Sequence, residues 1–169
     1  HRFPLILGLF VAIYACYMSY FTIQRMHVLS AHYFDLGIMH QTVFNTFRAI
    51  TGLDPSLILQ STNPHASDQI IRPAIHNDII LAFLAPFYLL YSGPETLLVI
   101  QSVVLAIGAV GLYMIAIHAW QDKPYARLFG LTVATAYLLS PAMNLTNIFE
   151  FHGVALGTTF LIFLYYFWC

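Results

Sequence analysis

The sequence predicts an all-α fold, a polytopic transmembrane helix bundle with amphipathic juxtamembrane helices in the first outer loop. The 169 residues are 60% hydrophobic and only 8% charged, whereas soluble globular domains carry roughly 25% charged residues. A soluble fold could not cover its surface with so few charges. Four apolar runs also approach the roughly 20 residues that a helix needs to cross a bilayer core about 30 Å thick.

These four runs cover residues 3–23, 96–117, 125–143 and 153–169. The first run is long for the apolar region of a secretory signal, and no small-residue cleavage site follows it, so we expect an uncleaved spanning helix. The last run reaches the end of the sequence without a polar flank. We therefore expect the chain to be the amino-terminal part of a longer protein.

A fifth apolar run, residues 79–91, has too few residues to span and is interrupted by Pro86. Its length is typical of a re-entrant or juxtamembrane segment. If it does not cross, the scarce basic residues Arg2, Lys123 and Arg127 share one face, as the positive-inside rule predicts for the cytoplasmic face. We expect a multi-pass protein of a prokaryotic cytoplasmic membrane.

With this topology, the loop of residues 24–78 and the later turn of residues 144–152 both face outside. Within the loop, residues 35–48 have the spacing of an amphipathic interfacial helix, with apolar side chains on one face at Leu36, Met39, Val43 and Phe47. Residues 51–73 are rich in Gly, Pro, Ser, Thr, Asn and Asp, and predict an irregular loop.

Acidic residues at the membrane boundary are the first candidates for chemistry. Asp35 has the position of a general base or a metal ligand, or of a cap at the start of its helix. Glu150 and His152 come directly before the last spanning run, where an extended turn would direct both side chains the same way. The alternative is that both merely face headgroups or water.

A second group of polar residues precedes the short apolar run. A helix that starts near His76 and Asp78 would direct its free N–H groups, together with Arg72, at an anion such as a phosphate. An ordinary polar helix cap explains the same residues. The net charge of −1 lacks the basic footprint of a nucleic-acid-binding protein, so we expect no nucleic-acid partner.

The chain resembles the DUF2079 family of predicted polytopic membrane proteins. The matching segments are Phe34-Asp35-Leu36-Gly37 with Gln41 and Asn45, His76 before the run containing Ala85-Pro86, Ser140-Pro141, and Phe149-Glu150-Phe151-His152. The chain departs from the family at two places. Asn77-Asp78-Ile79 stands where the family commonly has Phe-Ser-Pro, and Gly153 follows His152 where the family often has Pro-Glu, which removes one expected acid.

That family is similar in layout to the GT-C glycosyltransferases, multi-spanning enzymes that transfer a sugar from a polyprenyl-phosphate carrier at the outer face. The resemblance implies that Asp35 and Glu150 occupy the catalytic acidic positions. It implies that Asp35 activates an acceptor hydroxyl, and that Asp35 and Glu150 bind a divalent cation, Mg²⁺ or Mn²⁺. The residues it assigns to substrate binding are Arg72, His76, His152, Asn45 and Gln41.

A different class of function stays open. The chain is short for such an enzyme, so the alternative is a non-catalytic structural subunit that packs against other membrane protein subunits in a larger complex. The lipid bilayer is a partner of the chain in either function. A polyprenyl-phosphate lipid is a partner only if the chain is a glycosyltransferase.

Overall fold

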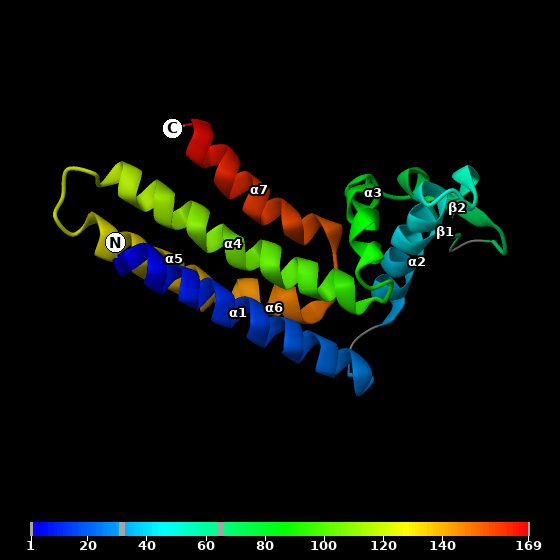
Figure 1. The fold of residues 1–169 in the computed structure, drawn as a ribbon, viewed down its shortest axis with the longest axis horizontal. Coiled ribbons are helices and arrows are strands. Elements are labelled where there is room, and N and C mark those ends of the chain that lie inside the picture. Colours follow the sequence, from blue (N-terminus) through cyan, green and yellow to red (C-terminus); the bar gives the residue numbers. More distant parts are fainter. Residues whose placement is uncertain (1, 31–32, 64–65, 169) are drawn as a thin grey trace.

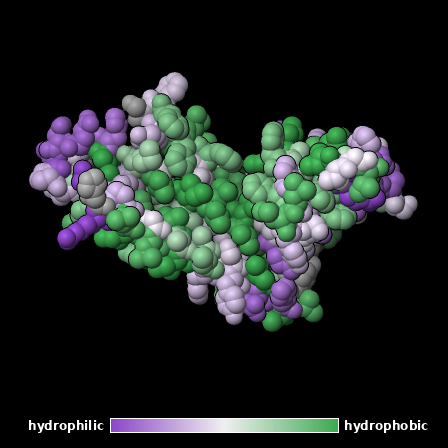
Figure 2. Space-filling model, in the orientation of Figure 1, coloured by the Kyte–Doolittle hydropathy of each residue, from purple (hydrophilic) through white to green (hydrophobic). Residues whose placement is uncertain are grey.

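The computed structural model describes residues 2–30, 33–63 and 66–168 and confirms the all-α fold class. The helix bundle consists of α1 (Arg2–His27), α4 (Glu95–Ala119), α5 (Ala126–Leu138), α6 (Pro141–Phe149) and α7 (Gly153–Trp168). The remaining elements gather at one end of the bundle, on the right in Figure 1. Apolar side chains cover the face of the bundle that Figure 2 shows, as expected of a surface in contact with lipid.

Two helices of the described residues, α1 and α4, are long and apolar enough to cross a membrane. Their 26 and 25 residues, at 1.5 Å per residue, exceed a bilayer core of about 30 Å. Helices α5 and α6 together are also long and apolar enough to cross. They make a third span if the bent pair is counted as a single membrane span. Helix α7 is apolar but has only 16 described residues, and Cys169, the last residue of the expected span, lies outside the described part.

The third expected span is not one helix, because residues 125–143 divide at Ser140-Pro141. Helix α5 ends at Leu138, α6 begins at Pro141, and their axes differ by 42°. Proline disfavours a helical conformation in the residue before it, and Ser140 is extended, with φ −60° and ψ 125°. Pro141 itself suits the first position of the new helix because its missing N–H is not needed there.

Helix α2 (Tyr33–Ile50) lies at the end of the bundle and is amphipathic, as its sequence pattern predicts. Leu36, Met39 and Val43 are buried, whereas Phe34 is exposed. These three side chains join one apolar core with residues of the short helices and the start of α4. The juxtamembrane region is therefore anchored to the bundle by its own apolar core.

The segment expected to be irregular contains a small hairpin. Strands β1 (Gln60–Thr62) and β2 (Gln69–Ile71) are antiparallel, with Ser61 opposite Ile70. The 3₁₀ turns η1 (Pro55–Leu57) and η2 (Arg72–Ala74) flank the hairpin. Three-residue strands carry too little alternating pattern to be distinguished from a loop by sequence.

The short apolar run folds as α3 (Ile80–Leu84) followed by the 3₁₀ helix η3 (Ala85–Leu89), and the change falls next to Pro86. Both elements pack beside α2 at one end of the bundle (Figure 1). His27, at the end of α1, lies 3.1 Å from Glu95, at the start of α4. The two long helices are therefore antiparallel, and residues 28–94 connect them at one end.

Candidate functional site

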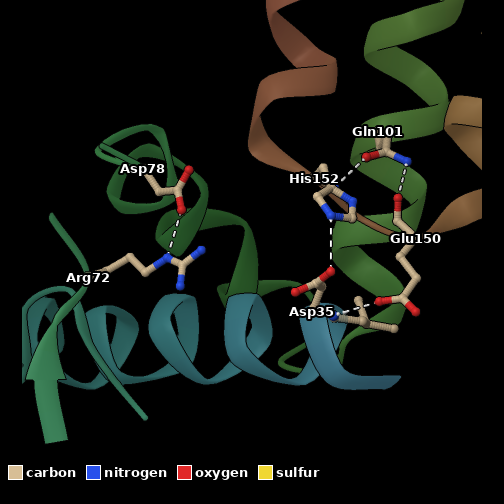
Figure 3. Close-up of polar contacts among 7 residues, drawn as sticks. Asp35, Arg72, Asp78, Gln101, Glu150 and His152 are labelled. Atoms are coloured by element: carbon tan, nitrogen blue, oxygen red, sulfur yellow. Dashed lines mark hydrogen bonds and ion pairs between the residues drawn. The ribbon is translucent and has the colours of Figure 1, made fainter. Parts of the chain in front are cut away.

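The site is built around the extended residues between α6 and α7. Helix α6 ends at Phe149, and Glu150 is extended, with φ 177° and ψ −176°. Its carboxylate Oε2 accepts a hydrogen bond of 3.0 Å from the backbone N–H of Leu36 (Figure 3). Leu36 is in the first turn of α2, where backbone N–H groups lack helical partners and the dipole favours a negative charge. Glu150, in the segment between α6 and α7, therefore caps the N-terminus of α2.

Gln101 holds this extended segment from α4. Its side chain is fully buried, its Nε2 donates to the backbone carbonyl of Glu150 at 2.8 Å, and its Oε1 accepts the N–H of His152 at 2.9 Å (Figure 3). One amide therefore satisfies backbone groups on both sides of Phe151, which is itself fully buried. Gln101 thereby joins α4 to the segment between α6 and α7.

The same segment brings His152 to Asp35. His152 Nε2 lies 3.3 Å from Asp35 Oδ2, and the side chains are 30% and 45% exposed. An ion pair this open to solvent adds little stability. The contact orients the two side chains, because the imidazole faces the carboxylate and both line one cavity. Glu150, the residue expected to share the chemistry of Asp35, lies against the neighbouring Leu36 instead of facing outward.

Arg72 is the second charged group of the site. Its Nε donates to Asp78 Oδ2 at 2.7 Å, and both side chains are largely buried. The backbone N–H of Arg72 also bonds the carbonyl of Leu59 at 2.7 Å. The ion pair and the backbone bond fix the guanidinium at the end of β2. Only Nε is used by Asp78, and a guanidinium has four further N–H donors on its two terminal nitrogens.

A cavity of about 510 Å³ connects these groups. It has the size of a small-molecule site, and its wall combines acidic, basic and imidazole side chains with a few apolar ones. The lining residues are Asp35, Met39, Arg72, His76, Asn77, Asp78, Ile80, His152, Gly153 and Val154. Four of the seven expected site residues therefore share one cavity, namely Asp35, Arg72, His76 and His152.

The other expected residues have structural contacts instead. Gln41 Oε1 accepts the backbone N–H of Thr62 at 3.0 Å and also the Thr62 hydroxyl. Asn45 Nδ2 donates to the carbonyl of Gln60 at 3.0 Å. Both side chains fasten β1 onto α2, and neither lines the cavity.

A buried polar pair attaches the short apolar segment to α2. His40 Nδ1 and the hydroxyl of Tyr88 are 2.8 Å apart. Burial lowers the pKa of His40 below its ordinary value of 6.5, although the negative charge of Glu95 raises it somewhat. Burial likewise raises the pKa of the Tyr88 hydroxyl. Burial therefore favours the neutral form of His40.

A family model described as "Predicted membrane protein (DUF2079)" matches residues 25–169. The chain belongs to the DUF2079 family. The match includes α2, the cavity and the extended segment before α7, so the whole candidate site lies within the residues that the family model matches. No match was found among curated proteins or among solved structures. Membership establishes a membrane protein that contacts the lipid bilayer, and the activity must be argued from the site.

The DUF2079 site offers few ligands for a metal ion. Among the residues that the structure describes, no three His, Cys, Asp or Glu side chains are grouped closely enough to bind one. The carboxylate of Asp35 opens on the cavity, whereas that of Glu150 bonds Leu36. A divalent ion between these two acids would need further oxygens, which Mg²⁺ commonly takes from water and from substrate phosphates.

Sequence reasoning missed two features of this DUF2079 site. It gave Asp78 no pairing role, although Asp78 follows Arg72 by six residues across a proline-containing turn that brings them together. It also considered Asp35 as the helix cap, whereas Glu150 bonds the N-terminus of α2. No local pattern could identify that capping residue, because 114 positions separate donor and acceptor.

Proposed function

We propose that this chain is a GT-C-like glycosyltransferase that takes its sugar from a polyprenyl-phosphate-linked donor at the outer membrane face. The observation that carries this proposal is a single cavity with an open carboxylate, Asp35, and a buried guanidinium, Arg72, in its wall. A carboxylate can accept a proton from a hydroxyl, and a guanidinium can bind phosphate oxygens. Their place at the end of a lipid-embedded bundle suits a substrate that is itself a lipid.

In the proposed reaction, the oxygen of an acceptor hydroxyl forms a bond to the anomeric carbon of the donor sugar. The bond between that carbon and the phosphate oxygen breaks, and the phosphate keeps the electron pair. The hydroxyl proton moves to the carboxylate of Asp35, which His152 orients from 3.3 Å. Proton removal by a positioned base typically contributes about 10² to 10⁴-fold to the rate.

Arg72 and His76 stabilise the leaving phosphate. The Arg72 guanidinium is held by Asp78, so its remaining N–H groups keep a fixed direction without reorganisation during the reaction. Glu150 acts in this scheme as a positioning residue, because its carboxylate bonds the helix that carries Asp35. When bound, Mg²⁺ or Mn²⁺ would neutralise part of the charge on the phosphate.

The test is sugar transfer in proteoliposomes, with a panel of radiolabelled polyprenyl-phosphate sugars as donors. Asp35→Asn should lower transfer by at least about a hundredfold. Asp122→Asn, which removes an exposed carboxylate from the opposite end of the bundle, should leave transfer unchanged. Full activity in Asp35→Asn, or no transfer from any donor by the unmodified chain, would reject the proposal and favour the alternative of a non-catalytic subunit.

A further inference from the structure

A second hollow lies at the other end of the bundle, where the turn between α4 and α5 meets the start of α1. Its volume is about 460 Å³. The lining residues are Phe3, Ile117, Gln121, Lys123, Pro124, Ala126, Arg127 and Leu128. Hydrophilic residues gather at this end of the molecule, on the left in Figure 2, whereas helix α2, which carries Asp35, lies at the other end of the bundle (Figure 1). The hollow is therefore independent of the proposed transfer reaction.

The charges around this hollow are mostly positive. The chain has six basic residues in total, and three of them, Arg2, Lys123 and Arg127, lie at this end. The one acidic residue in the adjoining turn is Asp122. Within the described ranges, neither Lys123 nor Arg127 forms an ion pair, so both cations are available to an anion.

The hollow also has apolar walls. Phe3, Ile117 and Leu128 line it beside the two cations. Next to it, Trp120 packs against Tyr125 and Phe129 with ring centroids 6.0 and 5.3 Å apart. Clustered Trp and Tyr are typical of the membrane–water interface. A ligand here meets cations at its polar end and apolar side chains at its other end.

We infer that this hollow binds the phosphate group of an anionic phospholipid. Basic pockets between membrane helices at the cytoplasmic face commonly bind anionic headgroups, and the positive-inside rule puts this end of the chain there. Lys123 and Arg127 bind the phosphate oxygens, and the Gln121 amide donates to the headgroup. The apolar walls favour a lipid over a free phosphate, because they bury the first methylene groups of the chains.

The test uses the fluorescence of Trp120 in a Trp168→Phe background, with the protein in vesicles that contain brominated phosphatidylglycerol or brominated phosphatidylcholine. The anionic lipid should quench Trp120 at a several-fold lower mole fraction than the zwitterionic lipid. Lys123→Gln and Arg127→Gln should each weaken this preference in part, and the double variant should abolish it. Arg48→Gln, which removes a positive charge from α2, is the matched control and should change nothing.

Equal quenching by the two lipids would overturn the inference. So would an effect of Arg48→Gln as large as that of the double variant, because the preference would then reflect net charge alone. Competition with inorganic phosphate distinguishes the phosphate group of a phospholipid from free phosphate. Millimolar phosphate should not relieve quenching by phosphatidylglycerol, and full relief would assign the hollow to free phosphate and overturn the lipid assignment. An unchanged unfolding temperature of the double variant shows that the fold is retained.

Discussion

The Glu150 carboxylate accepts the backbone N–H of Leu36 at 3.0 Å, across 114 residues of sequence. This bond joins the segment between α6 and α7 to the first turn of the juxtamembrane helix α2. Because His152 lies two residues further along and contacts Asp35, the same short segment determines where the candidate base lies. The position of α2 against the bundle is thus coupled to the geometry of the cavity.

Replacing Glu150 should loosen α2. Glu150→Ala leaves the buried N–H of Leu36 without its carboxylate acceptor, which costs about 1–3 kcal/mol. Glu150→Gln keeps an oxygen acceptor and should cost less. Thermal unfolding in detergent measures the overall loss, and amide hydrogen exchange at the start of α2 locates it. Unchanged exchange there in Glu150→Ala would contradict the capping role.

Replacing Gln101 should disturb the cavity although its side chain does not line it. Gln101→Met keeps a similar volume but loses the bonds to the Glu150 carbonyl and the His152 N–H, each worth about 1–3 kcal/mol when left unsatisfied. The readout is cross-linking of cysteines at positions 35 and 152 by a short thiol reagent, in a background with Cys16→Ser and Cys169→Ser. Cross-linking should slow markedly in Gln101→Met.

The matched control for Gln101 is Gln24→Met, which changes an exposed glutamine of α1 and should not affect the cross-link. A second cysteine pair at positions 27 and 95 reports on the bundle itself, because His27 and Glu95 are in contact. This pair should cross-link equally in every variant. An unaffected 35–152 cross-link in Gln101→Met would show that Gln101 does not position the segment.

Much of the fold could be predicted, because long apolar segments determine which residues form the helices of the bundle. The long runs that form α1 and α4 leave few alternatives in lipid, where backbone groups must bond within the helix. Helix α2 could be predicted from the spacing of Leu36, Met39 and Val43. Pro141 carried a signal for the bend between α5 and α6, since proline rarely continues a helix, but the apolar composition of residues 125–143 concealed it.

The site could be predicted only in part. The sequence predicts Asp35 and His152 at the same end of the helix bundle, because residues 79–91 are expected not to cross the membrane. The contact between the two side chains agrees with this. The contacts of Gln41 and Asn45 with β1 could not be foreseen, because the hairpin itself has no clear pattern. The pairing of Arg72 with Asp78 depends on a 3₁₀ turn whose geometry the sequence does not specify.

Stability should fall as the pH falls below about 6.5, and His40 should be one cause. Its pKa is lowered in the folded protein by burial, so the unfolded chain binds this proton more readily. The contribution of His40 is complete above the ordinary pKa and is lost as the pH falls through the lowered folded value. Thermal unfolding between pH 7.5 and 4.5 should depend less on pH in His40→Gln. The same substitution at exposed His118 is the control, and an equal effect of both would contradict the role of His40.

The outer loop and the turn between α4 and α5 should lie on opposite faces of the membrane. In the cysteine-free background, Gln69→Cys and Lys123→Cys both put a thiol at an exposed position. A membrane-impermeant maleimide added to intact cells should label position 69 and should label position 123 only after the cells are opened. The reverse pattern would invert the topology and remove the cavity from the outer face.

The most direct test of the proposed site is the affinity for a polyprenyl phosphate in nanodiscs. Arg72→Gln/Asp78→Asn removes both charges of the pair while keeping polar side chains, so that no buried carboxylate is left without a partner. The double variant should bind the phosphate at least about tenfold more weakly, as expected for the loss of charge-assisted hydrogen bonds. Arg48→Gln should bind it normally. Equal affinity of all three proteins would show that the phosphate does not bind at Arg72.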